Sequence, residues 1–190
     1  MSGSIGVLGG AFDPPHNGHV ALAREAIVHF ELDRLLVRVV ANPGHKEVET
    51  PAELRLRLAE LGFGSIAGAE VALDDCARTV DSLEALGLDD PVFVIGADQL
   101  AAFLTWTRPD RVLELARIGA ATRPGTDLPE LRRVIDLLPR PDRVELFPIT
   151  PLAVSSSEVR ERAAAGLPID DLVPAAVAAE IGRRGLYGAA

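Results

Sequence analysis

The sequence predicts the α/β class: a doubly wound parallel sheet of about five to six strands, flanked by helices. Short apolar runs alternate with helical patterns along the 190 residues, and this alternation is typical of βαβ units. The runs 35–41 and 92–96 are rich in β-branched residues, as expected of strands buried on both faces. No internal repeat or low-complexity linker interrupts the pattern, so we expect one domain over residues 1–190.

The elements follow one another in a regular order. The first apolar run ends at a glycine pair, and the helical pattern after it keeps Ala23, Ala26 and Phe30 on one side. Each later helix is indicated by apolar spacing of three and four residues, and each later strand by a short apolar run. We expect strands at 4–9, 35–41, 70–73, 92–96, 117–122 and 143–147. We expect helices at 18–30, 52–61, 79–86, 98–105, 109–116, 128–138, 156–165 and 174–184.

Composition narrows the function classes. The formal net charge of −9 argues against a nucleic-acid partner, because phosphate backbones are bound by clustered Lys and Arg. Cys76 is the only cysteine, so no intramolecular disulfide can form and a reducing cytoplasm is expected. No apolar run reaches membrane-spanning length, and no signal-peptide pattern opens the sequence. We expect a cytoplasmic protein with no membrane partner. The oligomeric state stays open, with a homo-oligomer as one alternative.

The segment between the first strand and the first helix carries the strongest chemical signal. It reads Gly9-Gly10-Ala11-Phe12-Asp13-Pro14-Pro15-His16-Asn17-Gly18-His19. Its glycines let the backbone approach a ligand, and its prolines delay the helix. Asn17 is the expected N-cap, which places His19 in the first helical turn, where free N–H groups and the helix dipole favour an anion. Zinc on Asp13, His16 and His19 is an alternative, but the glycine turn suits phosphate and no fourth ligand stands out.

A second phosphate-binding pattern is Val154-Ser155-Ser156-Ser157-Glu158-Val159-Arg160. Ser155 and Glu158 have the spacing of a capping box, so a helix is expected to start here. Ser156 and Ser157 precede Arg160 by four and three residues, which puts hydroxyls and a guanidinium on one helix face. Taken alone, such a segment is more often an ordinary capped helix. Together with the glycine segment, it favours a polyphosphate ligand.

Other candidates follow predicted strands, at the sheet edge where α/β proteins bind ligands. Asn42, Gly96-Ala97-Asp98 and Arg123 each occupy such a position. Asp98 has two interpretations: it accepts hydrogen bonds from a ribose hydroxyl, or it caps the following helix. Trp106, the only tryptophan, either stacks on a heteroaromatic ring or serves packing alone.

These motifs carry a family resemblance. His16-Asn17-Gly18-His19 resembles the H-x-G-H signature of the nucleotidyltransferase superfamily, and with Gly-Gly-x-Phe-Asp-Pro before it the segment is similar to bacterial nicotinate-nucleotide adenylyltransferases. The strings 93–100, 123–125 and 154–160 are similar to further motifs of that family. The resemblance implies a Rossmann-like fold and transfer of AMP from ATP to nicotinate mononucleotide. The products would be nicotinate adenine dinucleotide (deamido-NAD) and pyrophosphate, in NAD biosynthesis.

The resemblance also implies site residues. The expected catalytic residues are His16, His19 and Arg160. The expected ATP-binding residues are Gly9, Gly10, Phe12, Gly18, Gly96, Asp98, Arg123, Ser156, Ser157 and Arg160. The expected acceptor-binding residues are Asn42, His45, Lys46, Thr79 and Trp106. We expect no metal ligand in the protein, with Mg²⁺ carried by the ATP phosphates, and we expect the C-terminal helices, about 155–187, to close the ATP site.

Two departures from the family pattern leave the acceptor open. Gly44 stands where the family has a second proline, and Arg78 stands where tyrosine is common. Nicotinamide mononucleotide or a pantetheine phosphate is therefore an alternative acceptor, used with the same ATP half. A non-catalytic nucleotide sensor is a further alternative, which would keep the glycines but would not need His16, His19 and Arg160 together.

Overall fold

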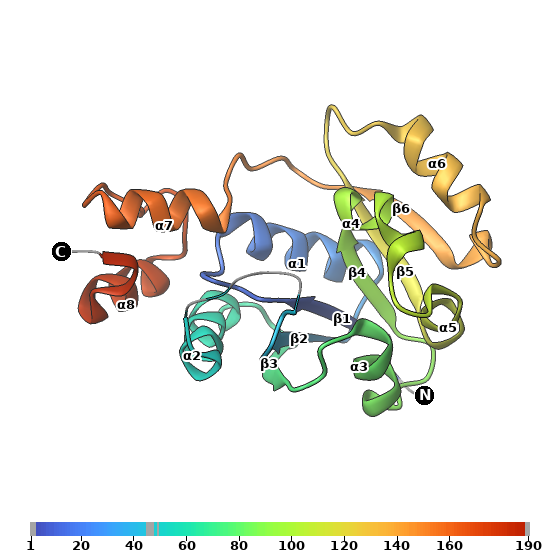
Figure 1. Cartoon of the computed structure of the whole chain (residues 1–190), viewed down its shortest axis with the longest axis horizontal. Coiled ribbons are helices and arrows are strands. Elements are labelled where there is room, and N and C mark those ends of the chain that lie inside the picture. The colour runs from blue at the N-terminus through green and yellow to red at the C-terminus, as the bar shows by residue number, and fades with distance from the viewer. Residues whose placement is uncertain (1–2, 45–47, 49, 189–190) are drawn as a thin grey trace.

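The computed structural model describes residues 3–44, 48 and 50–188, and its described part contains one six-stranded sheet (Figure 1). The strands are β1 (Ile5–Gly10), β2 (Arg34–Val40), β3 (Ala69–Asp74), β4 (Val92–Gly96), β5 (Arg117–Thr122) and β6 (Val144–Pro148). Their spatial order is β3-β2-β1-β4-β5-β6, and every pairing is parallel. The predicted doubly wound parallel sheet is confirmed, with the strand order of a Rossmann-like fold.

Helices connect the strands close to the predicted positions. They are α1 (Asn17–His29), α2 (Ala52–Phe63), α3 (Thr79–Leu86), α4 (Ala97–Ala101), α5 (Pro109–Leu115), α6 (Leu128–Asp136), α7 (Ser156–Ala164) and α8 (Ala175–Arg184), with short 3₁₀ turns η1 (Phe103–Thr105), η2 (Pro141–Arg143) and η3 (Leu186–Gly188). The single helix predicted at 98–105 is wrong, because the chain forms α4 and then η1. Ala102 separates them, and its carbonyl accepts bonds from the N–H and the hydroxyl of Thr105, a local competition that interrupts helices.

The sheet is covered on both faces, and alternate residues of each strand enter different cores. In β1, Leu8 packs with α1 and α2 in one cluster, whereas Val7 packs with α3, α5 and α6 in the other. In β4, Val94 and Ile95 divide in the same way. Burial on both faces explains why these strands read as continuous apolar runs.

The C-terminal helices form a third cluster beside the sheet. Val159 of α7 and Val177 of α8 pack there against Leu58 of α2. Figure 1 shows α7 and α8 together at one end of the molecule, next to α1 and α2. The backbone N–H of Asn17 at the start of α1 donates to the carbonyl of Leu172, 2.8 Å away. The C-terminal part is therefore fixed against the start of α1.

This topology makes the carboxyl end of β1 the candidate position for a ligand site. β1 lies between β2 and β4, so the chain winds away from it in opposite directions, and the crevice at such a point is where these sheets bind ligands. Within the described residues, no helix is both long enough and apolar enough to cross a bilayer.

Candidate active site

The glycine loop, residues 9–19, runs from the end of β1 into α1. Phe12 adopts a left-handed conformation with φ of 50°, and His16 is extended with φ −131° and ψ 171°. The N-cap is His16, so the prediction of Asn17 is wrong by one residue. The Asn17 side chain instead donates to the carbonyl of Asp171 at 3.0 Å, which adds a second bond between the loop and the C-terminal part.

His16 and His19 lie face to face. Their ring centroids are 3.7 Å apart, and the backbone N–H of His16 donates to Nδ1 of His19 at 3.3 Å. This contact favours the neutral tautomer of His19 in which Nε2 carries the proton. The edge of Phe12 meets the His19 ring at 5.1 Å. Aromatic packing and one backbone bond thus orient the second histidine.

The other histidine is buried and neutral. Burial lowers the pKa of His16 from 6.5 to about 4, because a cationic ring is poorly solvated there. Its Nδ1 is buried and has no hydrogen-bond partner among the described residues. A buried polar atom without a partner is uncommon. This nitrogen lies in the glycine loop, which the sequence pattern predicts to bind phosphate.

Glycine avoids tight contacts at two positions of the loop. A Cβ on Gly18 would lie 3.0 Å from Nδ1 of His16 and 3.2 Å from Val154. A Cβ on Gly10 would lie 3.0 Å from the Phe12 ring. A side chain at either position would therefore require the histidine or the phenylalanine to shift by a few tenths of an ångström.

Helix α7 is bonded directly to the glycine loop. Ser155 caps the helix, as predicted, and its hydroxyl accepts from the N–H of Glu158. The Ser156 hydroxyl donates to the carbonyl of Pro14 at 2.9 Å. Nη1 of Arg160 donates to the carbonyl of Asp13 at 2.7 Å, and Nη2 donates to the Ser157 hydroxyl at 3.2 Å. The two segments with phosphate-binding patterns therefore meet in space.

The carboxylate of Asp13 is held by the C-terminal end of the chain. The Tyr187 hydroxyl donates to its Oδ1 at 2.6 Å, and burial raises the pKa of Tyr187 well above its usual value. The sequence alone assigns no role to Tyr187. Among the described residues, no three His, Cys, Asp or Glu side chains are close enough to hold a metal ion, so the zinc alternative on Asp13, His16 and His19 has no support.

Arg55 of α2 is a residue that sequence reasoning missed. Its side chain is 1% exposed and donates to four backbone carbonyls around the glycine loop and the end of β2. A signal was present, because the buried positions of α2 recur at helical spacing and include Arg55 (Arg55, Leu58, Ala59, Gly62 and Phe63). A charged residue on the core-facing stripe of a helix needs compensating partners.

Gly96, Asp98 and Arg123 lie at the carboxyl ends of β4 and β5. Gly96 pairs with Ala121 in the sheet, and the Asp98 carboxylate lies 3.9 Å from the Arg123 guanidinium. The N-cap of α4 is Gly96, so Asp98 does not cap the helix. Its side chain is 95% exposed, which leaves its oxygens accessible to a ligand.

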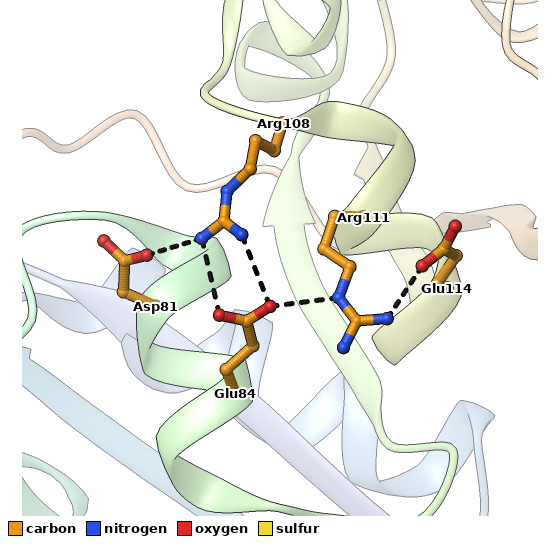
Figure 2. A network of polar contacts seen from close by, with 5 residues as sticks. All are labelled: Asp81, Glu84, Arg108, Arg111 and Glu114. Atoms are coloured by element: carbon orange, nitrogen blue, oxygen red, sulfur yellow. Dashed lines mark hydrogen bonds and ion pairs between the residues drawn. The ribbon is translucent and has the colours of Figure 1, made fainter.

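Trp106 comes directly after the 3₁₀ turn η1, and Thr79 lies at the start of α3. The Trp106 ring lies 5.0 Å from that of Phe103 and edge-on to Phe93 at 6.2 Å, and it is partly exposed. Figure 2 shows the ion-pair network that joins α3 to the start of α5, in which Arg108, two residues after Trp106, contacts Asp81 and Glu84 of α3. Arg111 and Glu114 of α5 complete it.

Asn42 follows β2 at the same edge of the sheet and is exposed. The other two candidates of its loop, His45 and Lys46, lie outside the described residues. Asp74 is buried at the end of β3 and accepts a bond from the Ser82 hydroxyl. Cys76 is partly exposed. Desolvation and the nearby Asp74 raise the pKa of its thiol, so it is not an activated nucleophile.

Comparison with known proteins finds a matching family model and several similar proteins. A family model described as cytidylyltransferase-like matches residues 7–162. A Bordetella avium protein described as a probable nicotinate-nucleotide adenylyltransferase is 37% identical over 193 residues, covering 96% of this chain and 97% of its own length. A Roseiflexus protein with the same description is 37% identical over 198 residues and covers 98% of both chains.

Solved structures show the same architecture. The structure of Plasmodium falciparum nicotinic acid mononucleotide adenylyltransferase complexed with APC is similar to this chain with a TM-score of 0.77 and 16% identity, over 98% of both chains. The structure of that enzyme complexed with NaAD gives a TM-score of 0.76 at 17% identity. At such low identity, this likeness supports the fold.

Proposed function

The chain belongs to the nicotinate-nucleotide adenylyltransferase family, within the cytidylyltransferase-like superfamily, and we propose that the residues gathered at the carboxyl end of β1 perform its reaction. That reaction transfers AMP from ATP to nicotinate mononucleotide and yields nicotinate adenine dinucleotide and pyrophosphate, a step of NAD biosynthesis. The observation that carries the proposal is the direct bonding of α7 to the glycine loop through Ser156 and Arg160. It unites two anion-binding patterns in one site.

The reaction needs positioning more than proton removal. An oxygen of the acceptor's 5′-phosphate attacks the α-phosphorus of ATP, the bond from that phosphorus to the bridging oxygen breaks, and pyrophosphate leaves with the electron pair. A phosphate monoester has a second pKa of about 6, so the nucleophile is ionised at neutral pH without a general base. The protein then contributes alignment and charge stabilisation.

The glycine loop and α7 supply that stabilisation in our proposal. Gly9, Gly10 and Phe12 shape the loop, Gly18 and the first turn of α1 face the phosphates, and His19 stabilises the leaving group. His16 is neutral in the free protein because its pKa is about 4, and a polyphosphate beside the ring would raise that pKa. Ser156, Ser157 and Arg160 hold the outer phosphates, since a guanidinium suits phosphate geometry. The C-terminal helices thereby close the ATP site.

The nucleoside parts bind along the same sheet edge. Gly96, Asp98 and Arg123 take the ribose and adenine of ATP, with the exposed Asp98 carboxylate accepting from ribose hydroxyls. Trp106 and Thr79 receive the pyridine ring, and Asn42 with His45 and Lys46 binds the acceptor phosphate. Mg²⁺ enters as the Mg–ATP substrate, because this cation prefers phosphate oxygens and water and keeps much of its hydration.

Exchange of one histidine tests this assignment. We expect His19→Ala to lower kcat by roughly 10²–10⁴-fold, the range for loss of an acid or an electrostatic group. His29→Gln is the matched control, because His29 lies at the other end of α1 and bonds to Glu145. Dinucleotide formation is followed by chromatography. Near-normal turnover of His19→Ala would contradict the role of the loop. Nucleotide binding by the wild-type protein without any dinucleotide would instead indicate a sensor.

A further inference from the structure

Arg55 connects the two loops that the proposed function assigns to different substrates. Its Nη1 donates to the carbonyl of Ala11 in the glycine loop and to the carbonyl of Val40 at the end of β2, each at 2.8 Å. Nη2 donates to Ala41 at 2.7 Å, and Nε donates to Thr50 at 3.0 Å. One guanidinium therefore bridges the ATP loop and both flanks of the loop that begins at Asn42.

Several observations separate this arginine from a surface residue. It is 1% exposed, and the four acceptors are all backbone carbonyls. Burial lowers the pKa of Arg55, and the charge of Asp13 partly offsets that effect. Burial of such a cation costs desolvation free energy. Its N–H groups donate to backbone carbonyls, so these donors are not available to bind a phosphate.

We propose that Arg55 is a positioning residue, which sets the spacing between the glycine loop and the end of β2 and so aligns the acceptor phosphate with the α-phosphorus of ATP. This inference rests on the proposed function. Reacting atoms must approach to roughly 3–3.5 Å, and a misplacement of about 1 Å costs roughly 10²-fold in rate. The planar fork reaches carbonyls of both loops at once, whereas a lysine ammonium is a single point with three donors.

The test compares the effect of a substitution on kcat with its effect on KM for each substrate. In Arg55→Lys, we expect kcat to fall at least about tenfold while KM for ATP and for nicotinate mononucleotide each changes less than about threefold. Arg57→Lys is the matched control on the same helix, because Arg57 is exposed and contacts only Glu60 among the described residues. We expect its kcat to equal that of the wild-type protein.

Chemical rescue provides a second readout that a purely structural role would not give. Arg55→Ala leaves a guanidinium-sized space, so low, non-denaturing guanidinium chloride should restore part of kcat, whereas the same concentration of sodium chloride should not. Folded Arg55→Lys with kcat within twofold of wild type would overturn the inference, and so would failure of guanidinium to raise the turnover of a folded Arg55→Ala. Wild-type protein that forms no dinucleotide would contradict the proposed function itself.

Discussion

The hydroxyl of Tyr187 donates a 2.6 Å hydrogen bond to Oδ1 of Asp13, across 174 positions of the sequence. The carbonyl of the same Asp13 accepts from Arg160. Main chain and side chain of one loop residue are thus held by two different C-terminal elements, η3 and α7. The final segment of the chain therefore stabilises the glycine loop at the carboxyl end of β1.

Removal of the Tyr187 hydroxyl tests this link. Tyr187→Phe leaves the buried Asp13 carboxylate without that donor, so we expect the free energy of unfolding to fall by about 1–3 kcal/mol. Urea denaturation of Tyr187→Phe, Asp13→Asn and the double variant forms a double-mutant cycle. A coupling above about 0.5 kcal/mol is expected for groups in contact. Additive effects would show that the bond contributes nothing to stability.

Stability should depend on pH through His16. Burial lowers its pKa from the ordinary 6.5, which the unfolded chain keeps, to about 4 in the folded protein, so between these values only the unfolded chain binds the proton. Stability is therefore unaffected by this group above about pH 7 and decreases as pH falls towards 4, by up to about 3 kcal/mol. Urea midpoints of wild type and His16→Gln from pH 7.5 to 4 check this, since other groups cancel in the difference. A pH-independent difference would mean that His16 is not buried as a neutral ring.

Arg160 and Arg162 provide a matched pair on one helix. Arg160 bonds to the glycine loop, whereas Arg162 pairs with Glu158 and Asp171. We expect Arg160→Lys to lower kcat/KM for ATP about tenfold or more, because the planar fork is lost although the charge is kept. Arg162→Lys should stay close to wild type. Isothermal titration with a non-hydrolysable ATP analogue should show the same order, and equal affinities for both variants would remove Arg160 from the triphosphate site.

Trp106 gives an optical signal for the acceptor. It is the only tryptophan, so changes in tryptophan fluorescence come from this side chain alone. If the pyridine ring stacks on it, nicotinate mononucleotide should quench the emission with a saturable titration curve, and Trp106→Leu should raise KM for the acceptor several-fold with little effect on KM for ATP. Quenching by ATP alone, without any response to the mononucleotide, would place the tryptophan elsewhere.

The sequence was most informative where local pattern determines structure. The strands are predicted to within about two residues. Burial on both faces makes a central strand such as β4 a continuous apolar run, and parallel topology brings Gly9, Gly96 and Arg123 to one edge. The predicted N-cap is off by one residue because His16, whose side chain is not a typical cap, is the last extended residue before α1. Arg55 was missed as a bridge because its partners are backbone carbonyls, which carry no sequence signature. The role of Tyr187 could not be predicted, because its contact with Asp13 joins residues that are far apart in the sequence and meet only in the folded chain.

Acceptor choice is the most direct test of the central claim. Initial rates with Mg–ATP and either nicotinate or nicotinamide mononucleotide, followed by chromatography of both dinucleotides, give the ratio of kcat/KM. Donors arranged for a ring carboxylate would face amide donors in the other substrate, a mismatch of about 1–3 kcal/mol. We predict a preference of about tenfold or more for nicotinate mononucleotide, with nicotinate adenine dinucleotide and pyrophosphate formed in equal amounts. Equal rates with the two acceptors, or preference for the amide, would contradict the account.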